Sequence, residues 1–192
     1  MIFRSNWNYT RRCIDIKFNS NAIYKSHGDG NFEKHDFKSI GENVTFEKGV
    51  MVFHPENIEI GNNVYIGHNT ILKGYYKNMM TIDNHTWIGQ NCFIHSAGGI
   101  TIGKGVGIGP MVKLLTSQHK GDDIKIPVLY TELNLNEVVL EDGCDIGIGS
   151  IILPGVIVGE GSIVGAGSIV TKNVEPYSVV AGVPARFLKK RG

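Results

Sequence analysis

The chain has 192 residues, of which 42% are hydrophobic, and its 19 basic and 18 acidic residues leave a net charge of +1. This length is sufficient for one buried core and short for two independent domains. The balanced charge provides no global field for nucleic acid or for an anionic membrane. We therefore expect a single domain whose binding specificity comes from local sites.

Residues 1–39 precede any regular pattern and predict an irregular N-terminal segment that packs on the element after it. Its start, MIFRSNWNYTRR, is polar and lacks the apolar core of a signal peptide. No later run of about 18 apolar residues could span a bilayer, so we expect a soluble, cytoplasmic protein. The three cysteines lie far apart, which indicates reduced thiols rather than a disulfide framework or a zinc site: Cys13, Cys92 and Cys144.

From Ile40 onward, an apolar residue returns every sixth position, with interruptions, eighteen times. A period of six is a multiple of the strand period, so each of these residues shares a face with the residue four positions later. Gly or Asn stands three positions later in twelve hexads and indicates a corner, because both tolerate positive φ. The apolar positions are Ile40, Phe46, Val52, Ile60, Ile66, Leu72, Ile82, Ile88, Ile94, Ile102, Ile108, Leu114, Leu140, Ile146, Ile152, Val158, Val164 and Val170.

Short strands joined by regular corners predict a parallel β-helix, in which successive coils stack and bury a continuous core. The step of six is broken only before Ile60, Ile82, Ile102 and Leu140, so the extra residues should stack along one edge. The longest insertion covers 117–137. Insertions in a repeat protein generally lie on one face, which is often the binding face, and a loop of this length is usually functional.

The recurring order of an aliphatic residue, Gly, two variable residues and a small residue resembles the hexapeptide-repeat acyltransferases, in particular the maltose and galactoside O-acetyltransferase group. The resemblance implies an all-β fold, a left-handed parallel β-helix with triangular coils of 18 residues. It covers 40–175 as about six coils, with the loop 117–137 protruding and a C-terminal tail, 176–192, that binds CoA. It also implies a homotrimer with active sites between subunits.

His119 stands at the root of the long loop, in GPMVKLLTSQHKGDD. In the O-acetyltransferases that the chain resembles, a histidine after a similar run acts as general base, which implies the same role for His119. A neutral imidazole suits the removal of a proton from an acceptor hydroxyl as it attacks the thioester. We therefore predict direct transfer of the acetyl group from acetyl-CoA to a sugar hydroxyl.

The C-terminal stretch GAGSIVTKNVEPYSVVAGVPARFLKKR looks like the closing coil and tail of the CoA-dependent members. The resemblance implies that backbone groups of Ala166 contact the pantetheine arm. It also implies that Thr171, Lys172, Arg186 and Lys189 lie near the adenine and the phosphates. Basic side chains in this segment suit the negative phosphate oxygens of CoA.

Three weaker candidates for the acceptor site are Trp87, Asn91 and His95. Trp87 falls where the family has an aromatic residue, and it either stacks on a sugar or the pantetheine arm or packs in a corner. Asn91 or a backbone N–H would stabilise the oxyanion, since Gly89 stands where the family has an asparagine. His95 lies on the third face of its coil.

Two further positions depart from the family pattern: Asp145 replaces a tryptophan, and Ile148 replaces a polar CoA contact. No metal site is predicted, because a zinc site of the kind found in this fold would need a second histidine at position 124, which is Ile124.

The residues leave several functions open. The first is O-acetylation of a saccharide, such as a polysaccharide or lipopolysaccharide precursor or a small sugar. The second is N-acetylation of an amino-sugar nucleotide, for which the acceptor amine must be neutral. The third is a non-catalytic β-helix that serves as a scaffold or binding subunit, which needs neither a histidine at the loop root nor a basic tail.

Overall fold

The computed structural model describes residues 26–192, so the expectations for the first twelve residues and for Cys13 lie outside the described residues. Cys92 and Cys144 are buried free thiols. The chain forms two compact units, and the segment His119–Leu133 belongs to a different unit from the β-helix. No helix in the described part of the chain is long and apolar enough to cross a membrane.

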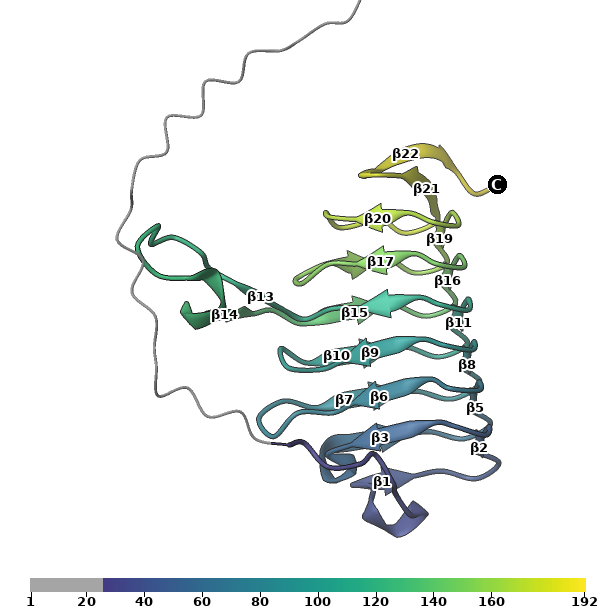
Figure 1. Ribbon diagram of the computed structural model, residues 1–192. Helices are drawn as coiled ribbons and strands as arrows, with labels where there is room; N and C mark the ends of the chain where they lie inside the picture. Colours follow the sequence, from purple (N-terminus) through teal and green to yellow (C-terminus); the bar gives the residue numbers. More distant parts are fainter. Residues whose placement is uncertain (1–25) are drawn as a thin grey trace, which may run out of the picture. The chain divides into compact units, whose positions relative to one another are not determined.

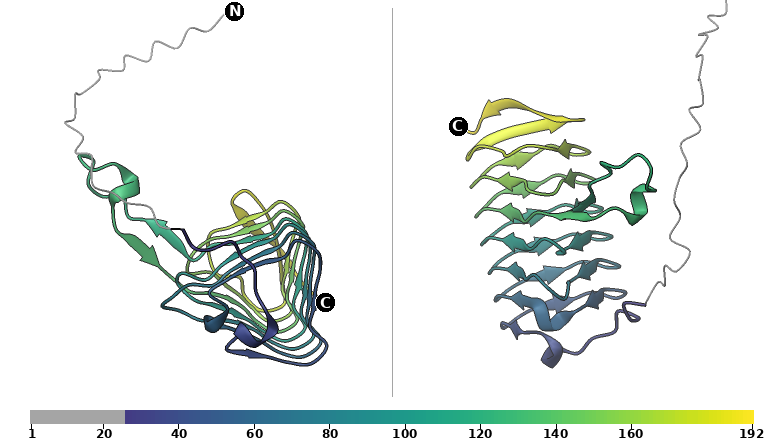
Figure 2. Two further views of the ribbon diagram at one scale, coloured as in Figure 1. Left: turned by 60° about the horizontal axis from the view of Figure 1, so that its bottom comes forward. Right: turned by 90° about the vertical axis from the view of Figure 1, so that its left-hand side faces the viewer.

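The β-helix is a left-handed solenoid in which three parallel sheets form the sides of a triangular prism (Figures 1 and 2). Sheet A contains β1 (Ser39–Ile40), β4 (Ile58–Ile60), β7 (Met80–Ile82), β10 (Ile100–Ile102), β15 (Val138–Leu140) and β18 (Ile157–Val158). Sheet B contains β2 (Thr45–Phe46), β5 (Tyr65–Ile66), β8 (Trp87–Ile88), β11 (Gly107–Ile108), β16 (Asp145–Ile146), β19 (Ile163–Val164), β21 (Ser178–Gly182) and β22 (Ala185–Lys190). Sheet C contains β3 (Met51–Phe53), β6 (Ile71–Lys73), β9 (Phe93–His95), β12 (Lys113–Leu114), β17 (Ile151–Ile152) and β20 (Ile169–Val170).

Each coil passes from sheet A to sheet B to sheet C, and six complete coils are followed by a partial seventh. In that last turn Val174 bridges to Val158, and β21 pairs in parallel with β19 before β22 folds back antiparallel on it. The left view in Figure 2 looks along the stack and shows the coils as superposed triangles. The predicted fold is therefore confirmed.

The apolar repeat forms the core of the prism. Sixteen of the eighteen predicted positions are buried, and the other two, Ile40 and Phe46, are partly buried in the first coil. The small residues four positions later also face inward, and their hydroxyl groups are bonded to backbone carbonyls, as for Thr70 to Gly89 (2.8 Å) and Ser162 to Glu175 (2.8 Å). Among the described residues, no buried side-chain nitrogen or oxygen lacks a partner.

The two ends of the solenoid are covered differently. At the first coil, the ring of Phe32 packs on Phe37 and Phe46, with centroids 5.7 and 4.9 Å away, beside the 3₁₀ helix η1 (Lys34–Asp36). At the last coil, the β21–β22 hairpin pairs with β19. Both coverings follow from local sequence that does not obey the period of six.

The insertions lie where sheet C passes into sheet A, as the interrupted period predicts. The first contains the 3₁₀ helix η2 (Pro55–Asn57), and the longest contains β13 (Ser117–His119), η3 (Val128–Tyr130) and β14 (Leu133–Leu135). The longest insertion, hereafter the excursion (residues 117–135), is closed at its base, because the backbone N–H of Asn136 donates to the carbonyl of Thr116 (3.0 Å). β10 and β15 then pair in register across it, Ile100 with Val138 and Ile102 with Leu140.

Candidate active site

His119 ends β13, and its imidazole is half-buried. Its Nδ1 lies 3.0 Å from the carbonyl oxygen of Thr131. A carbonyl can only accept a hydrogen bond, so Nδ1 carries the proton and Nε2 keeps its lone pair. This tautomer and the fixed ring orientation are what a general base requires.

The segment that holds Thr131 is itself well bonded. The hydroxyl of Thr131 donates to the carbonyl of Val128 (2.7 Å) and accepts from the N–H of Gly121 (3.2 Å). Lys120 and Glu132 form an ion pair of 2.7 Å beside it. The contact of His119 therefore rests on a folded hairpin, which the sequence predicted only as a long loop.

The corner between sheets B and C presents Asn91, Met111, Ile148 and Ala166 on successive coils, all of them exposed. Backbone bonds of 2.8 Å tie these coils together, from Met111 to Gln90, Gly149 to Pro110 and Gly167 to Ile148. Asn91 and Ala166, which the sequence singled out separately, thus lie along one edge. The side chains of Met111 and Ile148 make an exposed apolar strip between them.

Gly89 lies at this same corner, and its surroundings explain why the chain lacks the asparagine that the family has at this position. A Cβ on Gly89 would lie 2.6 Å from the backbone nitrogen of Pro110 in the next coil. An asparagine therefore does not fit at this position. Asn91, two residues after Gly89, carries an exposed amide side chain at this corner and adopts a left-handed backbone with φ of 57°.

Lys172 and Arg186 line a common hollow of about 240 Å³ between the last coil and the β21–β22 hairpin. Apolar Val170 and Phe187 also line it. Thr171 is exposed next to Lys172, and Lys189 is exposed on β22 opposite Val179. The structure brings these four predicted residues to the closing end of the solenoid, whereas Ala166 lies at the corner between sheets B and C.

Trp87 and His95 lie on different sides of the prism. Trp87 is on the outer face of sheet B and 42% exposed, so it does not pack in a corner. His95 is half-buried at the end of β9 on sheet C, opposite Lys73 in register and beside the ring of Tyr75. Burial lowers the pKa of His95, and the charges of Lys73 and His27 lower it further.

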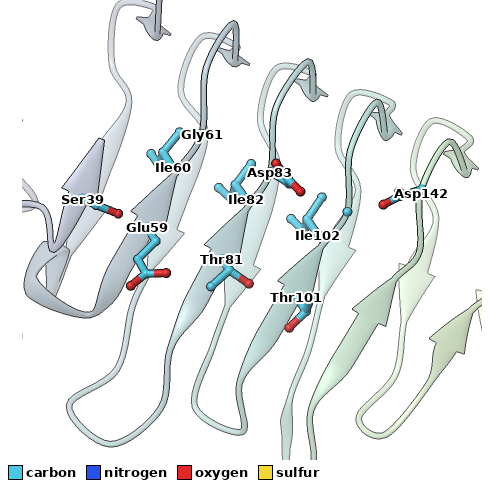
Figure 3. A pocket seen from close by; sticks show the side chains of 11 residues that line it. Ser39, Glu59, Ile60, Gly61, Thr81, Ile82, Asp83, Thr101, Ile102 and Asp142 are labelled. Atoms are coloured by element: carbon cyan, nitrogen blue, oxygen red, sulfur yellow. The ribbon is translucent and has the colours of Figure 1, made fainter. Parts of the chain in front are cut away.

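A separate hollow of about 420 Å³ lies on the outer face of sheet A. Figure 3 shows the side chains that line it, among them Ser39, Glu59, Thr81 and Thr101 from successive strands. None of the predicted site residues lines it. Within residues 26–192, no three His, Cys, Asp or Glu side chains lie close enough together to hold a metal ion.

The sequence reading missed one row of residues on sheet B. Tyr65, Trp87, Gly107 and Asp145 each stand one position before an inward-facing residue of the repeat, and they pair in register across four strands. The sequence signal for this row is the outward residue that precedes each inward residue in successive coils.

The chain is similar to several acyltransferases. A family model described as the hexapeptide repeat of succinyl-transferase matches residues 137–172. The dTDP-4-amino-4,6-dideoxy-D-glucose acyltransferase of Escherichia coli is 32% identical over 160 residues, which cover 81% of this chain and 83% of that protein. The galactoside O-acetyltransferase of Escherichia coli strain K12 is 34% identical over 82% of this chain and 66% of that protein.

A solved acyltransferase structure has the same fold as this chain. A variant of AntD, an N-acyltransferase from Bacillus cereus, has been solved in complex with dTDP-4-amino-4,6-dideoxyglucose and coenzyme A. It superposes with a TM-score of 0.74 at 29% identity, over 82% of this chain and 85% of that one.

Proposed function

Because the chain belongs to the hexapeptide-repeat acyltransferases, we propose that it transfers an acetyl group from acetyl-CoA directly to a saccharide, with His119 as general base. The observation that carries the proposal is the bond from His119 Nδ1 to the carbonyl of Thr131 (3.0 Å), which leaves Nε2 as the basic nitrogen. Membership of an enzyme family also means that the chain is an acyltransferase rather than a passive scaffold.

For the acceptor, we place the amino group of a nucleotide-linked amino sugar first. The similarity to the dTDP-amino-sugar acyltransferase extends over most of both proteins, and AntD has been solved with such an amino sugar bound. The hydroxyl of a saccharide is the second candidate, because the galactoside O-acetyltransferase is equally similar over the part that it shares with this chain.

An ammonium acceptor has two protons to lose on becoming an amide. The acceptor ammonium first releases one proton to solvent, and the neutral nitrogen then forms a bond with the thioester carbonyl carbon while the C–S bond breaks. His119 Nε2 takes the second proton from the nitrogen and passes it to the CoA thiolate. A hydroxyl acceptor has one proton to lose, and it follows the same route through His119.

For acetyl-CoA, we propose two groups of contacts. The strip from Met111 through Ile148 to Ala166 would lie along the pantetheine arm, and Asn91 or a corner N–H would donate to the oxyanion. Thr171, Lys172, Arg186 and Lys189 would meet the adenine and the phosphates. Support comes from the hollow that Lys172 and Arg186 share, since cationic side chains at an apolar hollow suit a nucleotide with several phosphate oxygens.

We also propose that the active protein is a homotrimer with active sites between subunits. The excursion carries exposed aliphatic side chains, including Ile124 (71%), Val128 (57%) and Leu129 (57%). Exposed aliphatic groups on a functional segment favour contact with another protein surface. A neighbouring copy of this chain is the partner that the family resemblance suggests.

The test of His119 is its replacement by Ala. We expect kcat to fall by about 10² to 10⁴, the usual contribution of a general base, while the thermal shift produced by CoA stays as in the wild type. His35→Ala is the matched control, because the His35 side chain is 83% exposed in η1. Thiol release would be measured with a panel of nucleotide amino sugars and neutral saccharides, and wild-type kcat in His119→Ala would exclude the assignment.

A further inference from the structure

Four residues form a straight row on the outer face of sheet B. Tyr65 pairs with Trp87, Trp87 with Gly107, and Gly107 with Asp145, in parallel register on β5, β8, β11 and β16 (Figure 1). Neighbouring strands lie about 4.8 Å apart. The row therefore places an aromatic pair and a carboxylate on either side of a position that has no side chain.

One face of the Trp87 indole is covered and the other is open. The Tyr65 ring stacks on it, with centroids 5.7 Å apart and planes 5° from parallel. Tyr65 is partly buried, and its pKa is raised by burial and by the negative charge of Glu47. On the opposite side the next strand contributes only Gly107, so the second face of the indole is accessible, in agreement with the 42% exposure of Trp87.

The Asp145 side chain leans over Gly107, the residue that separates it from Trp87 in the row. A Cβ placed on Gly107 would overlap Asp145 Oδ1, so the carboxylate lies over the glycine. Within residues 26–192, no hydrogen bond or ion pair engages that carboxylate. The absence of a side chain at position 107 thus allows the carboxylate to approach the indole.

Other carboxylates lie near this row, with Glu47 beside Tyr65, and Glu141 and Asp142 near Cys144. Burial raises the pKa of the Cys144 thiol to about 12, and Asp145, Glu141 and Asp142 raise it in addition. An aromatic face with a carboxylate beside it attracts a cation, because the ring quadrupole and the negative charge act in the same direction. A neutral hydroxyl receives only a hydrogen bond from the carboxylate.

We propose that Trp87 and Asp145 form the subsite that receives the ammonium group of the acceptor and so select an amino sugar over its hydroxyl counterpart. The inference rests on the proposed acyl transfer to a saccharide, but it assigns the choice of acceptor to two named side chains. Both act on binding of the protonated acceptor, before the amine loses its proton and attacks. Their loss should therefore raise KM more than it lowers kcat.

The test compares Asp145→Asn with wild type, using dTDP-4-amino-4,6-dideoxyglucose and dTDP-6-deoxyglucose as the amine and hydroxyl acceptors. We expect KM for the amine to rise about tenfold or more, with kcat changed less and the response to the hydroxyl acceptor unchanged. Raising the ionic strength should raise KM for the amine in the wild type and have little effect in Asp145→Asn. Glu42→Gln is the control, because it removes one exposed negative charge elsewhere.

Trp87→Phe keeps an aromatic ring on Tyr65 and should raise KM for the amine by a smaller factor than Trp87→Leu. Calorimetric binding of the amine acceptor without acetyl-CoA separates this inference from the proposed function, because it requires no turnover. Tenfold weaker binding to Asp145→Asn supports the subsite even if no acetyl transfer is detected. Equal affinity of Asp145→Asn and wild type for the amine would overturn the subsite, whatever the activity of the enzyme.

Discussion

At the scale of single residues, His95 shows how position in the prism changes the chemistry of a side chain. Its imidazole is held between the ring of Tyr75, at 6.0 Å, and that of Phe93, at 5.9 Å. Burial is the main reason why its pKa is lowered, and Lys73 and His27 act in the same direction. His95 therefore stays neutral in the folded protein at pH values at which a free histidine is charged.

This shift predicts a loss of stability in acid. In the unfolded chain His95 takes up a proton near pH 6.5, whereas in the folded chain it does so only at lower pH. The unfolded state then binds more protons, so the free energy of unfolding should fall as the pH drops below about 6.5 and level off below the folded pKa. In urea titrations from pH 7.5 to 5.5, His95→Asn should show a shallower fall than wild type. His35→Asn should match the wild type, and parallel curves for all three proteins would contradict the expectation.

The candidate site was predictable residue by residue where a side chain has a fixed place in the repeat. His119 could be identified at the loop root from sequence. Its bond to Thr131 could not, because that contact depends on a hairpin whose residues follow no period. Asp145 was visible only as a departure from the family, since its meaning depends on Gly107 and Trp87 in the coils beside it.

At the scale of elements, the corners repeat as regularly as the strands. The third residue after the inward position has a left-handed backbone in successive coils, with φ of 56° at Asn63, 60° at His85, 66° at Gly105 and 64° at Gly143. Glycines one position after the inward residue have a different role. A Cβ on Gly147 would lie 2.6 Å from the backbone nitrogen of Ala166 in the next coil, so this glycine permits the close approach of two coils.

The two kinds of glycine should respond differently to substitution. Gly147→Ala forces two coils apart, and we expect it to destabilise the protein by about 1–3 kcal/mol, as overpacking does. Gly143→Asn should be nearly neutral, because the position is open and other coils have Asn there. Thermal unfolding of both variants provides the comparison, and equal midpoints would show that coil spacing is not limiting at Gly147.

The strands and corners were predictable because every hexad repeats the same physical requirement. The β21–β22 hairpin was not, since the period ends near Val170 and the antiparallel return of Ala185–Lys190 depends on a turn rather than on a repeat. The hairpin of the excursion escaped prediction for the same reason. Elements outside the period have to be read from turn chemistry and local pairing.

At the scale of the whole molecule, the outer faces of the sheets differ in character. The outer side of sheet C carries a row of partly exposed apolar side chains on β3, β6 and β9, namely Met51, Ile71 and Phe93. The outer side of sheet A carries Glu59, Thr81 and Thr101 at corresponding places. Apolar rows of this kind favour burial against another copy of the chain.

Light scattering tests the assembly. Wild-type protein should have a mass near three times the 21.1 kDa of the chain. Ile71→Lys should lower that mass by placing a charge in the apolar row, whereas Thr81→Lys on the polar face should leave it unchanged. A wild-type protein that is monomeric at micromolar concentration would count against the trimer and against active sites between subunits.

The closure of the long excursion has a consequence for how such a protein can change over evolutionary time. Thr116 and Asn136 meet at its base, and β10 and β15 pair as though the intervening residues were absent. The segment between these two points can be lengthened, shortened or replaced without a shift in the register of the coils. The sequence of the excursion and the stability of the scaffold can then diverge under separate selection, and a segment grafted from a relative has a defined pair of joining points.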